Sequence, residues 1–397
     1  AIRFAGFTDP WEQRKLSEVA TFGGGHTPPM ADPDNYEDGY VLWVTSQDVK
    51  SNYLDRTTTQ ITEKGAKELT LYPAGSLVMV TRSGILRHTL PVAELRKPST
   101  VNQDIRVILP QGECCGEWLL QFFISHNKEL LLEFGKTGTT VESVDFGKIK
   151  DMLLYMPSTV EQQQIGDFFA KLDSLITLHQ RKYDKLVILK KSMLEKMFPK
   201  DGESVPEIRF AGFTDPWEQR KASEVFQIVD DRGHPTLPVL SATQNQGMIY
   251  RDDSGRYIGH DESNEIGYKR VLPGDFVVHL RSFQGGFAHS QYEGITSPAY
   301  TVFRAKEPTS HSDRFWKHWF MSEHFIAGLS TVTYGIRDGR SISVDEFMNT
   351  FLAFPAVEEQ AAISRLFDYL DDLITLHQRK LELLQNIKKS LLDKMFV

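Results

Sequence analysis

The segment IRFAGFTDPWEQRK occupies residues 2–15 and recurs without a single change at residues 208–221. We call these two copies the lead-ins. A longer and less strict repeat occupies residues 157–198 and 355–396, and both of its copies end in Lys-Met-Phe. Two copies are too few for a solenoid, in which at least three repeats stack on one another. The order of segments therefore predicts a pseudo-two-fold chain in which a globular segment and a helix each occur twice.

Both copies of the longer repeat have the spacing of a coiled-coil helix. Apolar residues recur at alternating steps of four and three, which is the a/d pattern of a heptad. The octapeptide LITLHQRK stands in each copy, at 175–182 and 373–380. We expect the two helices to pack on each other as an antiparallel coiled coil, because pseudo-two-fold symmetry gives them opposite directions. The predicted seam consists of Ile165, Phe169, Leu172, Ile176, His179, Leu186, Ile363, Phe367, Leu370, Ile374, His377 and Leu384.

Polar residues interrupt the two seams at equivalent places, namely His179 and Lys190 in the first copy and His377 and Lys388 in the second. His179 and His377 have no second metal ligand at a matching spacing, so we interpret them as seam residues that fix the register. An ordinary amphipathic helix on its own domain is the alternative, but a seam of about 33 residues is long for one. A helix of about 38 residues would form a rod of roughly 57 Å, which matches about 17 base pairs of duplex DNA.

The two globular segments, 16–156 and 222–354, resemble each other only in outline. Each contains a proline, an apolar run of strand length and then Arg-Ser, at 73–83 and 273–282. Further strands are predicted at 43–45, 105–109 and 300–303, and helices at 117–134 and 313–329. Each half is therefore predicted to be a mixed α+β domain. Divergent globular segments within a near-identical frame predict two different surfaces on one scaffold.

The composition is that of a folded protein of two or three domains. The chain has 397 residues, of which 40% are hydrophobic and 25 are Phe, so disorder is excluded as the main state. The most apolar short run, at 119–124, is far shorter than the roughly 20 residues that a membrane span needs. Cys114 and Cys115 are the only cysteines, and as neighbours they cannot form an ordinary structural disulfide. We therefore expect a cytoplasmic protein without membrane contact.

The net charge of the chain bears on nucleic-acid binding. Forty-five Lys and Arg against 53 Asp and Glu give a net charge of −8, which disfavours a free-standing nucleic-acid binder but permits a local basic cleft.

The motifs of the chain indicate no catalytic function. Gly135-Lys136-Thr137 lacks the earlier glycine of a phosphate-binding loop. The triplet at 23–25, Gly-Gly-Gly, is predicted to be a turn. Thr-Pro-Pro-Met at 27–30 differs at both ends from the corresponding element of amino-methyltransferases. The chain is therefore predicted not to be an enzyme.

The repeated motifs resemble a known family. Pro-x-x-x-Glu161-Gln162-x-x-Ile165 with its LITLHQRK helix, its twin at 355–363, and the two lead-ins are similar to the DNA-specificity (S) subunit of a Type I restriction–modification system. The resemblance covers essentially the whole chain. It implies a first target-recognition domain at 1–156, a helical spacer and linker at 157–207, a second recognition domain at 208–354 and a second spacer at 355–397.

The resemblance also implies a function and partners. Each recognition domain would read one half of a split DNA site, while the spacers set the gap and dock two methyltransferase (M) subunits. Those subunits would bind S-adenosylmethionine and methylate adenine, and restriction (R) subunits would use ATP and Mg²⁺. This chain itself would bind no cofactor and no metal, and it would bind DNA weakly without its partners.

Base-reading residues are predicted on loops of the two recognition domains. Arginine suits the O6 and N7 atoms of guanine, and Asn and Gln suit N6 and N7 of adenine. The predicted contacts in the first domain are Thr45, Ser46, Gln47, Arg82, Ser83, Arg87, His88, Asn102 and Gln103. Those in the second domain are Ser241, Thr243, Gln244, Asn245, Arg281, Ser282, Gln284, Arg337 and Arg340.

Two other functions are compatible with parts of the sequence. An adaptor whose globular halves bind proteins would show no salt-dependent DNA binding, even with its partners. A nuclease hidden in the first half would use Asp34, Asp48 and Lys50 and would nick DNA with Mg²⁺. The nuclease pattern is common by chance and has no counterpart in the second half of the chain.

Overall fold

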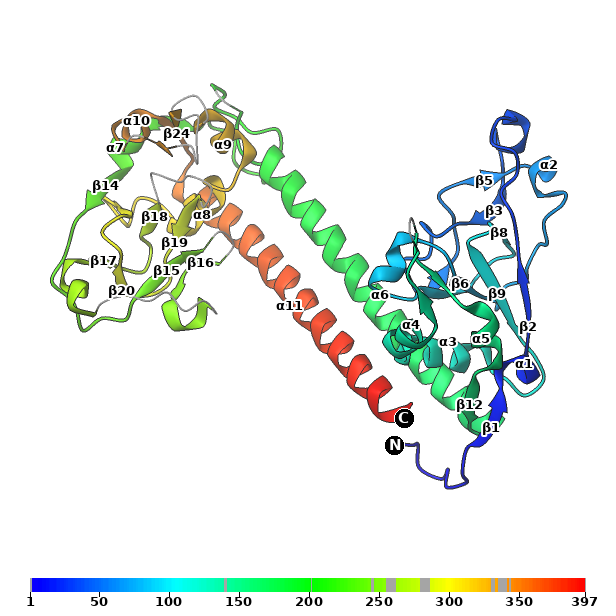
Figure 1. Cartoon of the computed structure of the whole chain (residues 1–397). Helices are drawn as coiled ribbons and strands as arrows, with labels where there is room; N and C mark the ends of the chain where they lie inside the picture. The colour runs from blue at the N-terminus through cyan, green and yellow to red at the C-terminus, as the bar shows by residue number, and fades with distance from the viewer. Residues whose placement is uncertain are drawn as a thin grey trace. The chain divides into compact units, whose positions relative to one another are not determined.

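The chain forms two compact units. A computed structural model describes residues 2–138, 141–200, 202–243, 246–254, 262–278, 286–329, 333–334, 341–342 and 344–396. The first unit comprises Ala1–Gln180 together with Arg379–Val397, and the second comprises Arg181–Gln378 (Figure 1). This division cuts each long helix in two. The domain boundaries stated from the sequence, which treat the helices as separate spacers, remain a prediction.

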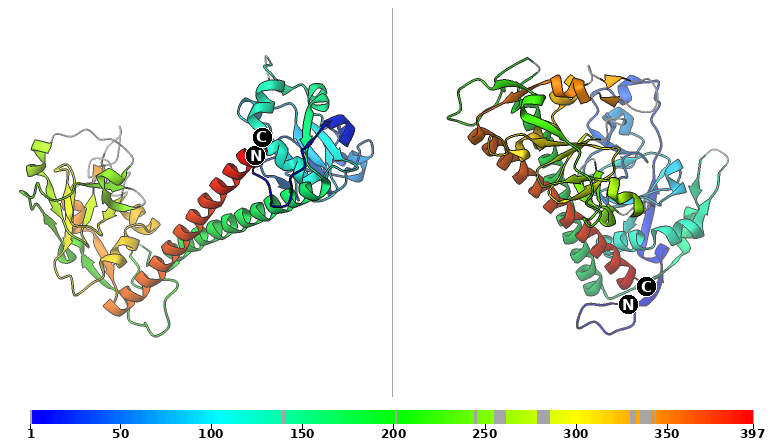
Figure 2. Two further views of the ribbon diagram at one scale, coloured as in Figure 1. Left: turned by 90° about the horizontal axis from the view of Figure 1, so that it is seen from below. Right: turned by 90° about the vertical axis from the view of Figure 1, so that its left-hand side faces the viewer.

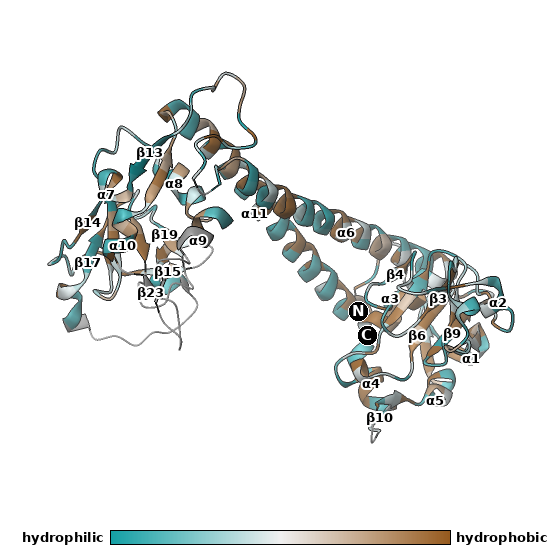
Figure 3. Cartoon of the chain, turned by 90° about the horizontal axis from the view of Figure 1, so that it is seen from above, coloured by the Kyte–Doolittle hydropathy of each residue, from teal (hydrophilic) through white to brown (hydrophobic). Residues whose placement is uncertain are grey.

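The first unit is built on a five-stranded sheet in the order β2-β9-β6-β7-β4, beside a three-stranded sheet β5-β3-β8. Leu77–Val80 of β6 is wholly buried, which agrees with its near-continuous apolar sequence (Figure 3). Trp118 and Phe123 of α3 pack on one face of the larger sheet. The strands and helices are β2 (Ala20–Gly24), β3 (Val41–Val44), β4 (Tyr53–Leu54), β5 (Gln60–Ile61), β6 (Leu77–Val80), β7 (Val92–Leu95), β8 (Thr100–Val101), β9 (Ile105–Pro110), β10 (Gly135–Lys136), β11 (Ser143–Val144), α1 (Leu16–Val19), α2 (Glu63–Ala66), α3 (Gly116–Ser125), α4 (Asn127–Phe134) and α5 (Phe146–Asp151).

The second unit has a four-stranded sheet in the order β14-β21-β18-β19, and its two-stranded pairs include β15-β16, β17-β20 and β22-β23. Its core is rich in aromatic residues, with Phe226, Phe303, Phe315 and Trp316 fully buried. The elements are α7 (Ala222–Val225), β14 (Phe226–Val229), β15 (Leu240–Thr243), β16 (Gly247–Tyr250), β17 (Lys269–Val271), β18 (Phe276–Val278), β19 (Phe287–His289), β20 (Gly294–Thr296), β21 (Thr301–Ala305), α8 (Asp313–Trp319), α9 (Glu323–Leu329), β22 (Thr333–Tyr334), β23 (Ser341–Ile342) and α10 (Val344–Asn349).

The two helices predicted between the strands are each broken. The segment predicted at 117–134 forms α3 and α4, because His126 leaves helical geometry and stacks its ring on Phe122 with centroids 4.3 Å apart. The segment predicted at 313–329 likewise forms α8 and α9. The α+β class itself is confirmed. No helix in the described part of the chain has the length and apolarity needed to cross a membrane.

The long helices α6 (Thr159–Lys196) and α11 (Val357–Met395) pair in opposite directions, as the heptad spacing predicts. In the first unit, Ile165 and Phe169 near the start of α6 share a core with Leu384 and Leu391 near the end of α11. In the second unit the roles are exchanged: the start of α11 packs with the end of α6. Seam residues nearest each helix start are buried, and those near the middle are half-buried.

Each helix therefore completes the core of the unit built by the other repeat. Phe396, at the end of the second repeat, lies with its ring 6.2 Å from those of Trp118 and Phe169 in the first unit. Phe198, at the end of the first repeat, stacks on Phe367 in the second unit at 5.7 Å. The N and C ends meet in the first unit, where the amide of Ile2 donates to the Lys394 carbonyl at 2.7 Å (Figure 2).

Candidate functional site

The lead-ins form the same clamp in both units. Arg3 donates two hydrogen bonds to the Glu161 carboxylate at 2.8 and 2.6 Å, and Arg209 does the same to Glu359 at 2.8 and 2.7 Å. Both glutamates are buried in the first turns of the long helices. Each lead-in then continues as a strand antiparallel to the one that precedes its helix. These pairs are β1 (Glu12–Lys15) with β12 (Leu153–Met156), and β13 (Glu218–Lys221) with β24 (Phe351–Phe354).

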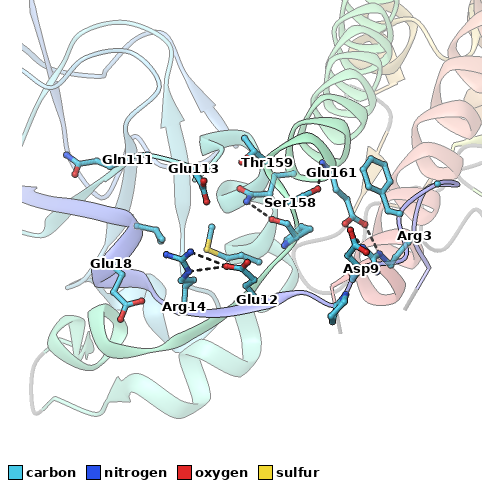
Figure 4. Close-up of a pocket in the computed structure, with 18 residues that line it drawn as sticks. Arg3, Asp9, Glu12, Arg14, Glu18, Gln111, Glu113, Ser158, Thr159 and Glu161 are labelled. Atoms are coloured by element: carbon cyan, nitrogen blue, oxygen red, sulfur yellow. Dashed lines mark hydrogen bonds and ion pairs between the residues drawn. The ribbon is translucent and has the colours of Figure 1, made fainter.

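The glutamine after each clamp glutamate ties the helix start to a short helix of the same unit. The Nε2 atom of Gln162 donates to the Pro157 carbonyl at 2.8 Å, and its Oε1 accepts from the Cys115 amide at 2.9 Å. Gln360 makes the equivalent pair of bonds in the second unit. A cavity of about 620 Å³ lies beside this junction in the first unit, between the lead-in and the start of α6 (Figure 4). The Glu-Gln motif therefore has a structural role, because both side chains make hydrogen bonds that hold the lead-in, the long helix and a short helix of the same unit together.

The seam lysines form ion pairs at symmetry-related places, and the pair is buried in the first unit and half-buried in the second. Lys388 of α11 lies 2.6 and 2.8 Å from the two carboxylate oxygens of Asp173 in the first unit. Lys190 of α6 donates to Asp371 of α11 at 2.5 Å in the second unit. Both aspartates occupy the same position in the longer repeat. The two lysines that interrupt the heptad are therefore paired with aspartates across the helix pair.

A network of charged residues surrounds the second-unit pair. His318, Asp368 and Asp371 form the one cluster in the described residues that could hold a metal ion. Its carboxylates are already neutralised, because Arg314 and Lys317 lie 3.0 and 3.6 Å from Asp368. Hydrogen bonds from His318 and the nearby cations outweigh burial and lower the pKa of Asp368 to about 2, whereas burial lowers the pKa of His318. The cluster is best explained as part of the helix junction.

The strand register brings the predicted first-unit contacts to one edge of the sheets. β2 and β6 end where β9 begins, with Gly24 opposite Arg106 and Val80 opposite Ile105. β3 ends beside β8, with Val44 next to Val101. We call this the loop edge of the first unit, and it comprises residues 25–27, 45–48, 81–91 and 102–106. All nine first-unit residues predicted to contact DNA lie in these segments.

The side chains at the loop edge differ in their exposure and in whether they already form hydrogen bonds within the protein. Gln47, Arg82 and His88 are exposed. Thr45 donates to Asp48 at 2.8 Å, and Ser83 accepts from the Ile85 amide at 3.5 Å. Gln103 accepts a hydrogen bond from Thr27, Arg87 pairs with Glu142 at 2.6 Å, and Ser46 is half-buried. Asn102 is buried and closes its own turn by accepting from the Asp104 amide at 3.1 Å.

Few of the second-unit contacts lie in the described part of the chain. Ser241 and Thr243 belong to the hairpin of β15 and β16. Thr243 donates to the Gly247 carbonyl at 2.8 Å and so helps to close the turn. The other predicted contacts fall outside the described residues: Gln244, Asn245, Arg281, Ser282, Gln284, Arg337 and Arg340.

Arg106 also lies at the loop edge, and loop-based reasoning from the sequence did not select it. It is the second residue of the otherwise apolar strand β9 and is half-buried. The signal available in the sequence was an arginine within the run Ile105–Leu109, whose other members are all apolar.

The predicted nuclease residues serve structural contacts. Asp48 accepts from the amide and the hydroxyl of both Thr45 and Thr58, and these bonds lower its pKa. Asp34 lies 2.9 Å from Lys64. The Asp48 carboxylate therefore ties two loop segments together, the Asp34 carboxylate pairs with a lysine of α2, and the two do not belong to a common metal-binding cluster.

Comparison with known proteins finds similarity to one family of proteins. A model of the Type I restriction modification DNA specificity domain matches residues 8–187. The EcoR124I/EcoR124II specificity subunit of Escherichia coli is 29% identical over 186 residues, which cover 44% of this chain and a little under half, 46%, of that protein. The MjaVIII specificity subunit of Methanocaldococcus jannaschii is 22% identical over 410 residues, which cover 97% of this chain and 92% of that protein. The chain is therefore similar to Type I restriction–modification DNA specificity subunits, by a family model over a little under half of its length and by relatives of up to 29% identity.

The fold agrees with this similarity. The crystal structure of a Type I restriction–modification S subunit from M. genitalium matches with a TM-score of 0.59, covering 99% of this chain and 97% of that one at 10% identity. At that identity the likeness concerns the fold alone. Specificity subunits are non-catalytic, in agreement with the prediction that this chain is not an enzyme.

Proposed function

We propose that this chain reads a split DNA target, one half-site with each unit, and directs methyltransferase and restriction subunits to it. The observation that carries the proposal is that the two units share the same lead-in and helix contacts but differ at the ends of their sheets. The clamp, the Glu-Gln motif and the seam ion pair recur in both units. The first-unit ladder of β2 and β9 ends with Gly24 opposite Arg106, whereas the second-unit ladder of β14 and β21 ends with Val229 opposite Val302 and is followed by Asp230 and Thr301.

The side chains at the loop edge are chemically suited to base recognition. Gln47 and Gln103 offer amides for adenine, and Arg82 offers an exposed guanidinium for guanine. The net charge of −8 indicates that this chain supplies few of the phosphate contacts that position a protein on DNA. We therefore expect weak, salt-sensitive binding by the chain alone and much tighter binding by the assembled complex.

The repeated frame is suited to two copies of one partner. Each unit presents the same fourteen-residue lead-in beside a long helix, so two methyltransferase (M) subunits would meet equivalent surfaces. In this proposal the M subunits hold S-adenosylmethionine and methylate adenine N6, and restriction subunits supply the ATP- and Mg²⁺-dependent reactions. The two long helices act as spacers that set the gap between the half-sites. The complex would work in the cytoplasm.

A methylome tests the proposal directly. N6-methyladenine is mapped by long-read sequencing in the host and in a strain that lacks this gene. We expect methylation to disappear at one split motif, which has two short defined halves around a fixed gap. Re-expression of the intact chain should restore the motif and serves as the control.

The opposite result would favour the adaptor function. If no motif is lost although the gene and its M partner are both expressed, the chain does not direct methylation. The nuclease alternative has lost its structural basis, because Asp48 is bound by two threonines, Asp34 pairs with Lys64, and the two carboxylates form no common metal-binding cluster. Mg²⁺-dependent nicking by the purified chain would nevertheless restore it.

A further inference from the structure

Arg106 is a half-buried arginine without a partner. It lies on β9 between Gly24 of β2 and Met79 of β6. Its guanidinium forms no hydrogen bond or ion pair with any residue that the structure describes. Every other half-buried arginine in the described ranges has a carboxylate partner, namely Arg3, Arg209, Arg220, Arg251, Arg270 and Arg304.

Leaving a guanidinium half-buried and unpaired is unfavourable. The group loses part of its hydration, and nothing in the fold replaces the lost hydrogen bonds. Arg304 shows the usual solution in this protein, because it lies in the second-unit sheet and makes two hydrogen bonds to Asp275 at 2.8 and 2.7 Å. The N–H groups of Arg106 at the loop edge are therefore free to donate hydrogen bonds to a ligand that carries acceptor atoms.

The glycine triplet at 23–25 makes room for this arginine. A Cβ atom on Gly24 would lie 2.6 Å from Nη1 of Arg106, at the flexible end of that side chain. Its neighbours are constrained by other groups. A Cβ on Gly25 would lie 1.8 Å from the Val101 carbonyl oxygen, and one on Gly23 would lie 2.2 Å from the Tyr72 hydroxyl. Of the three glycines, Gly24 is thus the one that leaves space for the guanidinium of Arg106, because a side chain at this position would overlap with it.

We propose that Arg106 is a specificity-determining residue of the first unit, which donates to the O6 and N7 acceptors of a guanine while Gly24 keeps its guanidinium in place. This rests on the proposed DNA-reading function. A planar guanidinium matches the two acceptors of guanine. A phosphate contact would be useful at both half-sites, yet the second unit has no arginine at the corresponding place: its ladder of β14 and β21 ends with Val229 opposite Val302, and the next residues are Asp230 and Thr301. Asp230 is also engaged there, because it pairs with Arg232 at 2.6 Å.

The test uses the full chain assembled with its M subunits and the split motif found by the methylome. Binding is measured to the motif duplex and to every duplex with one substituted base pair. We expect Arg106→Ala to weaken binding to the motif by roughly 5- to 150-fold. Replacement of one G·C pair, in one half-site only, should then cause no further loss. Arg106→Lys should also lose most of the discrimination, because it keeps the charge but not the planar pair of donors.

Gly24→Ala provides a second test that leaves the arginine in the chain. The added methyl group displaces the guanidinium, so discrimination should fall at the same base pair while the melting temperature stays close to wild type. Gly25→Ala should instead destabilise the protein, because its Cβ meets a backbone oxygen. Lys128→Ala removes an exposed charge on α4 and should leave the discrimination unchanged.

Three results would overturn the inference. Binding that is unchanged in Arg106→Ala would show that the side chain meets no part of the DNA. An even loss across all duplexes, however large, would assign the guanidinium to a phosphate. Relaxation at different base pairs in Arg106→Ala and Gly24→Ala would separate the two residues. Failure of the proposed function is distinct, because the wild-type complex would then show no methylated motif.

Discussion

Replacing Lys388 with methionine should destabilise the first unit by about 3 to 5 kcal/mol, because it leaves the Asp173 carboxylate buried without its counter-ion. Both side chains are only about one-tenth exposed. Asn52 also donates to Asp173, at 3.0 Å, which favours the lower end of that range. The matched variant Lys190→Met should cost less, about 1 to 2 kcal/mol. Its partner Asp371 is 30% exposed and also lies 3.5 Å from Lys317.

Hydrogen exchange of the full chain separates the effects on the two units. Amides of α3 and β6 should lose protection in Lys388→Met, and amides of α8 should lose less in Lys190→Met. At about 2 to 4 °C per kcal/mol, the first substitution should lower the melting temperature of its unit by roughly 6 to 20 °C. Adding Asp173→Asn to Lys388→Met should recover much of the loss, since the uncompensated charge is then gone. Equal losses in both lysine variants, or no recovery in the double variant, would refute the reasoning.

Four further substitutions test other parts of the two units. Glu359→Gln should lower the stability of the second unit by about 2 to 4 kcal/mol, because the buried carboxylate accepts from Arg209 and from Trp217 at 3.0 Å. Glu161→Gln should cost less in thermal unfolding, since Arg3 is more exposed than Arg209; equal costs would contradict this. Burial lowers the pKa of His311 to about 4, and the indole of Trp316 donates to its Nδ1 at 2.6 Å, so its ring is neutral in the fold. The unfolded chain takes up the proton first, so second-unit stability should fall by up to about 3 kcal/mol as the pH drops from 6.5 to 4. His311→Gln should flatten that slope in denaturant titrations, and an unchanged slope would exclude His311 as its source. Phe396→Ala should cost about 3 to 5 kcal/mol in the first unit; hydrogen exchange would contradict the assignment if the loss appeared in the second unit.

The spacing of the repeats predicted the paired long helices, because a coiled coil has a regular heptad pattern. Steps of four and three place apolar side chains on one stripe of a helix, so the seam from Ile165 to Leu172 could be predicted without a structure. The lysines in the seam were visible as exceptions. Their partners were not, because Asp173 and Asp371 lie next to the seam and nothing in the spacing distinguishes them from solvated carboxylates.

The candidate contacts were predicted less completely, for a different reason. Polar residues after strands were expected on loops, and the register does bring Thr45, Arg82 and Gln103 to one edge. The polarity of a loop alone cannot show that the side chain of Asn102 already accepts a hydrogen bond from the Asp104 amide within its own turn. Nor could it indicate Arg106, which lies in a strand and stands out only when Gly24 is known to be opposite it.

The exchange of helix ends has a consequence for the order in which the chain leaves the ribosome. The core of the first unit contains Leu392, Met395 and Phe396, which are translated after everything else in that core. About 200 residues separate its two segments, so at 5 to 20 residues per second its folding waits roughly 10 to 40 s for them. The second unit needs only the end of α6, which is translated before the rest of it. The unit encoded first is therefore the last to be finished, and its nascent apolar face remains uncovered during that interval.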